Sequence, residues 1–129
     1  MMLSFIRDRN KKGQAAEDIA SRYLQKQGLV SVDSNFFSRC GEIDLIMRDN
    51  DYLVFIEVRY RKQTDYGHPL ETITYSKQQK ILKTVQYFLL KHPEFSSLPC
   101  RIDAVAISAG KHHYAEENIE WIRNAIEFS

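Results

Sequence analysis

The sequence GEIDLIMRDNDYLVFIEVRYR, residues 41–61, reads as two β-strands joined by a tight turn. Polar and apolar residues alternate in both halves, as they do in strands that bury one face. Asn50 and Asp51 form the predicted turn, because both residue types tolerate the positive φ of a two-residue hairpin loop. Strict alternation places the consecutive residues Asp44 and Leu45 on opposite faces of the sheet.

If the turn has two residues, pairing of the strands brings acidic side chains together. Asp44 then lies opposite Glu57, and Glu42 lies opposite Arg59. Directly opposed side chains have Cβ atoms about 4.5–5.5 Å apart, so the carboxylates of Asp44 and Glu57 repel each other. A divalent cation between them, or a strongly raised pKa of one of them, removes this repulsion.

Basic residues at the same strand end favour the cation. Arg59 and Arg61 alternate with Glu57 along the second strand, and Lys62 follows directly. A metal ion flanked by fixed positive charges is an arrangement with which proteins bind and cleave phosphodiesters. The hairpin therefore predicts a metal-dependent site for a polyanion.

The composition is that of one globular domain covering residues 1–129, with 43% hydrophobic and 27% charged residues. The net charge is +1, but residues 1–92 contain 15 basic and 11 acidic residues, so the positive excess accompanies the acidic hairpin. Cys40 and Cys100 form no CxxC pair, which is typical of reduced thiols in a cytosolic protein. No apolar run approaches the roughly 20 residues of a membrane span. The sequence therefore predicts a cytoplasmic protein without membrane contact.

The remaining segments predict an α/β fold in which helices flank a mixed sheet. Residues 1–12 read as a flexible basic lead-in, and the following helix ends at Gly28. A second helix has Ser76 as its N-cap, with Gln79 completing a capping box. The predicted elements are helices at 13–27 and 76–92, strands at 29–38 and 99–109, a loop at 62–75, and an edge strand or closing helix at 118–126.

Several residues outside the hairpin have both an ordinary and a functional interpretation. Glu17, beside the apolar stripe of the first helix, is either a solvated acid or a carboxylate aimed at the metal. The lysines of the second helix are either solvated or in contact with phosphates. Asp103, inside an apolar strand, is expected to pair with Arg101 or a loop amide. The residues expected to position a nucleic-acid backbone without reading its sequence are Arg39, Arg61, Lys62, Lys77 and Lys80.

These residues together resemble a known pattern. A glutamate-bearing helix, then GEIDLI, then Glu57-Val58-Arg59 on the next strand is similar to the motif of the PD-(D/E)xK nuclease superfamily. More narrowly, the chain resembles the YraN family of uncharacterised small bacterial proteins, which are similar to archaeal Holliday junction resolvases. The likeness runs from about Gly13 to Ile107 and includes residues 13–17, Asn35 and residues 101–103.

The resemblance implies a restriction-endonuclease-like αβββαβ core that binds Mg²⁺ or Mn²⁺ and cuts nucleic acid, with branched DNA as the favoured substrate. On that pattern Asp44 and Glu57 match the metal ligands, and Glu17 matches the helix-borne acid. The carbonyl of Val58 and the carboxylate of Glu42 are candidate further ligands. Symmetric cutting of two strands would need a homodimer.

Arg59 departs from the pattern, in which this position usually holds lysine. Lysine can lose its proton when buried and act as a general base, whereas arginine stays protonated. Arg59 is therefore expected to orient the attacking water or to hold a phosphate oxygen. Two other interpretations stay open. One is a nucleic-acid-binding module that no longer cuts; the other is an adaptor in which Arg59 and Arg61 merely neutralise Asp44 and Glu57.

Overall fold

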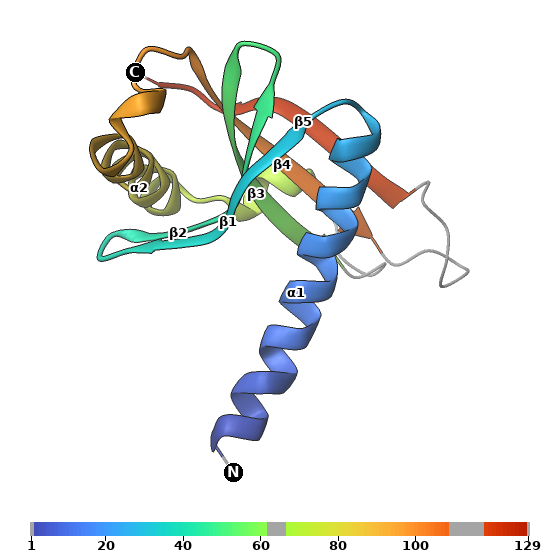
Figure 1. The fold of residues 1–129 in the computed structure, drawn as a ribbon. Coiled ribbons are helices and arrows are strands. Elements are labelled where there is room, and N and C mark those ends of the chain that lie inside the picture. Colours follow the sequence, from blue (N-terminus) through green and yellow to red (C-terminus); the bar gives the residue numbers. More distant parts are fainter. Residues whose placement is uncertain (1, 62–66, 109–117, 129) are drawn as a thin grey trace.

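The computed structural model describes residues 2–61, 67–108 and 118–128, with side chains from Gly13 onward. Short 3-10 turns flank the second helix, at Pro69–Thr72 and Pro93–Phe95. The chain order (Figure 1) is α1 (Met2–Lys26), β1 (Val30–Ser38), β2 (Gly41–Asp49), β3 (Tyr52–Arg61), α2 (Tyr75–Lys91), β4 (Cys100–Ser108) and β5 (Ile119–Ile126). The predicted α/β fold with an αβββαβ order is confirmed, and the last element is an edge strand rather than a helix.

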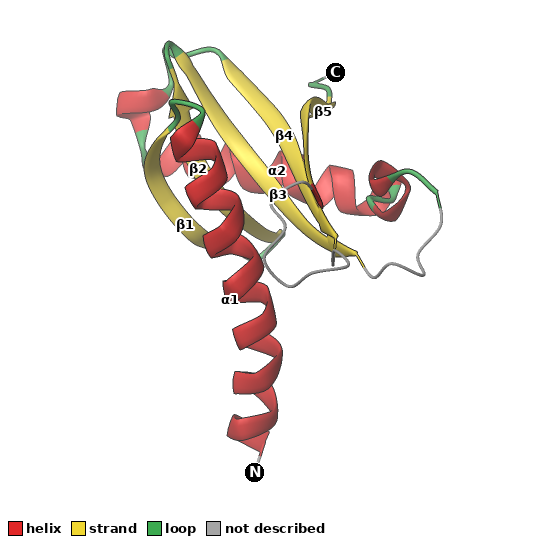
Figure 2. Ribbon diagram, turned by 90° about the vertical axis from the view of Figure 1, so that its right-hand side faces the viewer, coloured by secondary structure: helices red, strands yellow, loops and turns green. Residues whose placement is uncertain are grey.

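The five strands form one mixed sheet in the order β1-β2-β3-β4-β5. Neighbouring strands are antiparallel except β3 and β4, which are parallel and are connected by the crossover through α2. Figure 2 shows α1 on one face of the sheet and α2 on the other. The central strands β3 and β4 are thus covered on both faces, and this explains why β4 is almost continuously buried and β3 is buried from Leu53 to Ile56.

Each helix closes one apolar core. The α1 core lies between α1 and one face of the sheet. In it, Ala20 and Leu24 of α1 are fully buried, together with sheet residues such as Ile56 of β3. On the opposite face, Phe88 of α2 packs against Phe55 with the two ring centroids 5.7 Å apart and the planes at 81°, an edge-to-face geometry that aromatic pairs prefer. Successive residues of β3 therefore serve different cores.

Helix α1 ends as predicted but begins earlier. Gly28 has φ +102°, and its N–H donates to the carbonyl of Gln25 at 3.0 Å, as in a glycine-terminated helix. The helix starts at Met2 rather than near Gly13, because no proline interrupts the preceding residues. Its N-terminal part extends away from the sheet (Figures 1 and 2). No helix in the described part of the chain has the length and apolar character that a membrane span requires.

The start of α2 corrects the predicted capping box. Thr74, not Ser76, is the N-cap, and its hydroxyl accepts a hydrogen bond from the N–H of Lys77 at 3.3 Å. Both residues carry a hydroxyl group, so composition alone did not distinguish them. The helix consequently begins at Tyr75 and places Lys77 in its first turn.

The β2–β3 turn has two residues, as predicted, since Asp49 pairs with Tyr52. Strict alternation in β2 was wrong, however. Asp44 is hydrogen-bonded to a residue of α1 and Leu45 packs in the α1 core, so these consecutive side chains lie on the same face. In the neighbouring strand, Asn35 lies between the residues that pair with Leu45 and Ile43 and has a left-handed φ of +52°. A left-handed residue bends a strand and shifts the phase of its side chains.

A buried ionic cluster holds the other end of the sheet. The guanidinium of Arg101 donates to both carboxylate oxygens of Asp103 at 2.9–3.2 Å and to Asp49 at 2.9 Å. Asp103 also accepts hydrogen bonds from Trp121 Nε1 at 2.9 Å and from the N–H of Asn124 at 3.0 Å. The predicted pairing of Asp103 with Arg101 is confirmed, and the cluster joins β2, β4 and β5.

Candidate active site

The candidate site lies where β2 and β3 diverge. Cross-strand pairing between β2 and β3 begins beside the turn with the pair Asp49–Tyr52 and ends with the pair Leu45–Ile56. At the next position Asp44 is buried, and its Oδ2 accepts a hydrogen bond from the N–H of Val58 at 2.8 Å. The Asp44 side chain thus bonds the edge of β3 directly, and the divergence of the strands leaves room for a carboxylate between them.

Helix α1 brings Glu17 to Asp44. The Glu17 carboxyl donates a hydrogen bond to the Asp44 carboxylate and accepts one from the Asn35 side chain. Burial and the charge of Asp44 raise the pKa of Glu17 from 4.5 to about 7. The Oε2 atom of Glu17 is buried and has no hydrogen-bond partner among the described residues. Of the two interpretations of Glu17, the structure therefore supports the acid that faces the site.

Asn35 is the site residue that the sequence analysis did not assign a role. It lies in β1 between the residues that pair with Leu45 and Ile43, and its side chain is hydrogen-bonded to Glu17. An asparagine among β-branched and aromatic strand residues was the available signal, since asparagine is one of the few residues that tolerate a left-handed backbone.

Glu57 is the second acid of the hairpin and is partly buried. Burial and the charge of Asp44 raise its pKa from 4.5 to about 8, against the opposing effects of Arg59 and Lys77. Its Oε1 lies 3.4 Å from the guanidinium of Arg59. The short contact favours an ionised Glu57, but burial and the carboxylate of Asp44 outweigh it. The balance of these effects keeps the pKa of Glu57 above its ordinary value.

Together the site contains four carboxyl groups that oppose one another's ionisation. Burial and the neighbouring Asp44 raise the pKa of Glu42, and burial raises that of Asp44 itself. Glu42 in turn raises the pKa of Glu17 and Glu57. The repulsion predicted for Asp44 and Glu57 is thus present, extended by acids from α1 and from the first residues of β2.

The basic residues predicted for the site occupy different places. Arg59 is half-buried beside Glu57, and its Nε has no hydrogen-bond partner in the described chain. Lys77, in the first turn of α2, is near enough to Glu57 to lower its pKa. Arg61 donates to the carbonyl of Gly67 at 2.8 Å, so it fixes the end of a loop. Lys62 lies outside the described residues.

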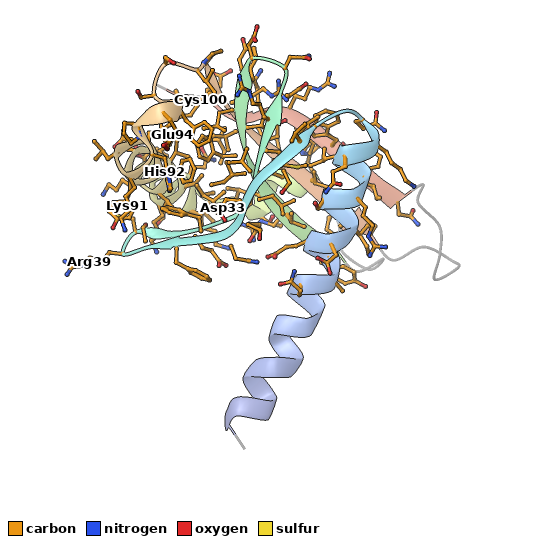
Figure 3. All side chains as sticks on the ribbon, viewed as in Figure 1. Asp33, Arg39, Lys91, His92, Glu94 and Cys100 are labelled. Carbon is orange, nitrogen blue, oxygen red and sulfur yellow. The ribbon has the colours of Figure 1, made fainter. Side chains whose placement is uncertain are left out.

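The β1–β2 turn and α2 are fastened to each other. The hydroxyls of Ser38 and Thr84 are 3.2 Å apart, and a β-carbon on Gly41 would lie 3.7 Å from the Cβ of Lys80. Lys80 is therefore placed against the turn that leads into the acidic strand. Figure 3 shows Arg39 at the tip of the same turn, with its side chain directed away from the body of the protein.

The donor set suits a hard cation that keeps much of its hydration. Within residues 2–61, 67–108 and 118–128, no three His, Cys, Asp or Glu side chains form a complete metal-binding group. Mg²⁺ commonly binds through one or two carboxylates and retains several waters. Asp44 and Glu57 can supply such carboxylates, and a bound cation would relieve the repulsion that raises their pKa values.

His68, in contrast, has an ordinary structural role. Its Nδ1 accepts a hydrogen bond from the N–H of Leu70 at 3.2 Å and caps the 3-10 turn that precedes α2. His68 therefore stabilises the loop before α2 and has no assigned role at the four carboxyl groups.

Comparison with known proteins identifies the family. The model of "Uncharacterised protein family UPF0102" matches residues 16–107, which include all four acids. A UPF0102 protein of Coxiella burnetii (strain RSA 493 / Nine Mile phase I) is 49% identical over 117 residues, covering 91% of this chain and 92% of that protein. One of Saccharophagus degradans is 45% identical over 116 residues (90% and 92%), and one of Legionella pneumophila (strain Corby) is 43% identical over 117 (91% and 95%). The chain belongs to the UPF0102 family.

Proposed function

We propose that this protein is a metal-dependent nuclease of the PD-(D/E)xK kind, which hydrolyses phosphodiester bonds of nucleic acid, in the first place DNA, in the cytoplasm. The observation that carries the proposal is the group of four mutually repelling carboxyl groups beside Arg59 and Lys77. A bound cation relieves the repulsion within such a group, which protonation of the carboxyl groups otherwise relieves. Negative groups that bind a cation, next to fixed positive charges, suit a phosphodiester.

The ligands we propose are Asp44 and Glu57, assisted by the carbonyl of Val58 and by Glu42. The hydrogen bond from the Val58 N–H to Asp44 Oδ2 fixes the orientation of the Asp44 carboxylate. A bound Mg²⁺ or Mn²⁺ supplies Lewis-acid chemistry, because it lowers the pKa of a coordinated water and offsets negative charge on the phosphate.

Arg59 and Glu17 take the remaining roles. The partly exposed guanidinium of Arg59 holds a non-bridging phosphate oxygen. Because arginine cannot act as a base, Glu17 is the group proposed to take up the proton of the attacking water, which it can do in its ionised form. Lys77 and Lys80 hold the flanking phosphates.

The test compares the parent with Glu57→Gln and, as a control with the same chemical change, Glu120→Gln on the exposed edge of β5. We expect the parent and the control to cleave DNA in Mg²⁺ or Mn²⁺ and Glu57→Gln to be at least about 100-fold slower, since second-shell changes at metal sites already cost about 10–100-fold. Mn²⁺ should raise the melting temperature of the parent and the control but not of Glu57→Gln.

The 3.4 Å contact between Glu57 and Arg59 favours a second candidate, a nucleic-acid-binding module that does not cut. In that case Arg59 neutralises Glu57 permanently and no cation enters. Binding to DNA without cleavage in either metal, together with a melting temperature that Mn²⁺ leaves unchanged, would replace the nuclease by this module.

A further inference from the structure

We propose that the exposed rings of Phe37, Tyr60 and Tyr75 stack on unpaired bases, so that the site takes a nucleic-acid strand with unpaired bases rather than continuous duplex. The inference rests on the proposed function in that it needs a nucleic acid at the carboxyl cluster. It goes further by stating which part of the nucleic acid the protein contacts besides phosphate.

The three rings are exposed without a partner. Phe37 is 68%, Tyr60 58% and Tyr75 75% exposed, and none of them takes part in a ring or cation contact with another described residue. Two other exposed tyrosines do have such contacts: the guanidinium of Arg101 lies 5.4 Å from the ring centre of Tyr52, and Tyr87 has both an aromatic and a lysine neighbour. The unpartnered rings therefore differ from the exposed tyrosines elsewhere on the sheet and on α2.

Each of the three rings accompanies a different part of the candidate site. Phe37 is the cross-strand partner of Glu42, so the two side chains share a face with their Cβ atoms about 4.5–5.5 Å apart. Tyr60 follows Val58 by two residues in β3, and Val58 packs in the α1 core, so Tyr60 points to the face on which Glu17 of α1 meets Asp44. Tyr75 begins α2, two residues before Lys77. The rings thus come from β1, β3 and α2, the elements that surround the divergence of β2 and β3.

The chemistry of a nucleic-acid strand matches this arrangement. Aromatic side chains stack on bases of any sequence, and basic side chains beside them follow the phosphates. In a continuous duplex the bases are stacked on one another and offer no free face, so the rings would contribute little there. In a single strand, or at a junction where strands separate, the bases are free to stack on the protein.

The experiment measures the dissociation constants of the full chain by fluorescence anisotropy in EDTA, which prevents cleavage. The ligands are a labelled single strand, the blunt duplex of the same sequence, and a duplex with one splayed end. The variants are Phe37→Ala, Tyr60→Ala and Phe37→Trp. Phe128→Ala is the matched control, because Phe128 is also exposed but lies beyond β5 near the chain end.

We expect Phe37→Ala and Tyr60→Ala each to weaken binding of the single strand and of the splayed duplex by about five-fold to more than a hundred-fold. Binding of blunt duplex should stay unchanged, Phe37→Trp should bind as the parent does, and Phe128→Ala should have no effect. Melting temperatures of all variants within the error of the parent's show that the losses are not due to unfolding.

Three results would overturn the stacking proposal. Unchanged single-strand affinity in both alanine variants would do so, as would an equal loss for duplex and single strand. The third is a change of mass in sedimentation on Phe37→Ala with unchanged DNA binding, which would assign the ring to a contact between two copies of the chain. If the parent still cleaves DNA with metal in these cases, the proposed function stands. If the parent protein binds no nucleic acid, both the stacking proposal and the proposed function are wrong.

Discussion

Among single residues, Glu57 and Glu17 give the site an unusual response to pH. Both have raised pKa values, about 8 and about 7, where the ordinary value is 4.5. Between 4.5 and those values the folded chain binds more protons than the unfolded chain, so the free energy of unfolding falls as the pH rises. We expect this decline in EDTA from about pH 4.5 to about pH 8, followed by a plateau, in urea denaturation.

The control for this pH dependence is Glu57→Gln, which removes the group with the largest shift. Its free energy of unfolding should decline less steeply and should equal or exceed that of the parent at pH 8. A parent whose stability increases over the same range would show that the carboxyl groups are ionised and paired, and would remove the reason for a cation.

Arg59 allows a test of the departure from lysine. Because its proposed role is to hold a phosphate oxygen, Arg59→Ala should slow cleavage by about 10²–10³-fold, the cost typical of a lost transition-state donor. Arg59→Lys should retain much of the activity, since lysine also donates to phosphate. Single-turnover cleavage rates, measured together with dissociation constants, separate a loss of transition-state stabilisation from a loss of DNA binding. Equal losses in binding and in cleavage would mean that Arg59 only binds the substrate and does not stabilise the transition state.

At the scale of elements, the bend of β1 at Asn35 positions the site. Asn35 has a left-handed φ and lies next to the point of β2 where Asp44 and Leu45 face the same side. We expect Asn35→Ala to lower the free energy of unfolding by about 1–2 kcal/mol, the cost of a left-handed non-glycine residue, as measured by urea denaturation.

The matched variant Asn35→Gly separates backbone from side chain. Glycine adopts a positive φ without steric cost, so Asn35→Gly should be more stable than Asn35→Ala. Both variants lose the hydrogen bond to Glu17 and should cut more slowly than the parent. If Asn35→Gly were no more stable than Asn35→Ala, strain at this position would not explain the bend.

The boundaries of the hairpin strands could be predicted because their signals are local. β2 and β3 have the predicted bounds, since Asn50 and Asp51 fit only a short turn and the flanking residues alternate. The cap of α2 could not be predicted, because Thr74 and Ser76 both carry hydroxyl groups and the choice depends on where the preceding 3-10 turn ends.

For the molecule as a whole, the Arg101–Asp103 cluster is the main polar interaction of the interior. We expect Arg101→Met to lower the free energy of unfolding by about 3–5 kcal/mol, because it leaves the buried carboxylate of Asp103 without its cation. Thermal and urea denaturation measure the loss. Arg123→Met, which removes only a cation lying 4.1 Å over the ring of Trp121, should cost about 1 kcal/mol or less.

A double variant tests whether the stability lost in Arg101→Met comes from leaving the Asp103 carboxylate buried without a cation. The double variant Arg101→Met with Asp103→Leu should recover part of the stability lost by Arg101→Met alone, because apolar groups of similar volume often replace a buried ion pair. A double variant less stable than the single one would mean that the bonds of Asp103 to Trp121 and Asn124 carry most of the stabilisation.

The candidate site as a whole was only partly predictable. The predicted cross-strand pairs Asp44–Glu57 and Glu42–Arg59 are absent from the register, which ends at Leu45–Ile56 because the strands diverge there; Asp44 still influences Glu57 through its charge. The approach of Glu17 depends on how α1 lies across the sheet. The sequence therefore left two interpretations of Glu17 open. The direction of Arg39 at its turn, away from the body of the protein, was likewise not encoded in any periodic pattern.

The sheet order has a consequence for how the chain reaches this structure. Strands β1, β2 and β3 are neighbours both in sequence and in space, so their pairing closes only short loops. β4 pairs with β3 across the crossover through α2, so the residues in this contact are far apart in the sequence. Contacts of this kind slow folding. Every acid of the candidate site belongs to the first 57 residues, in the part of low contact order. We expect that part to assemble first and the docking of β4 to limit the folding rate.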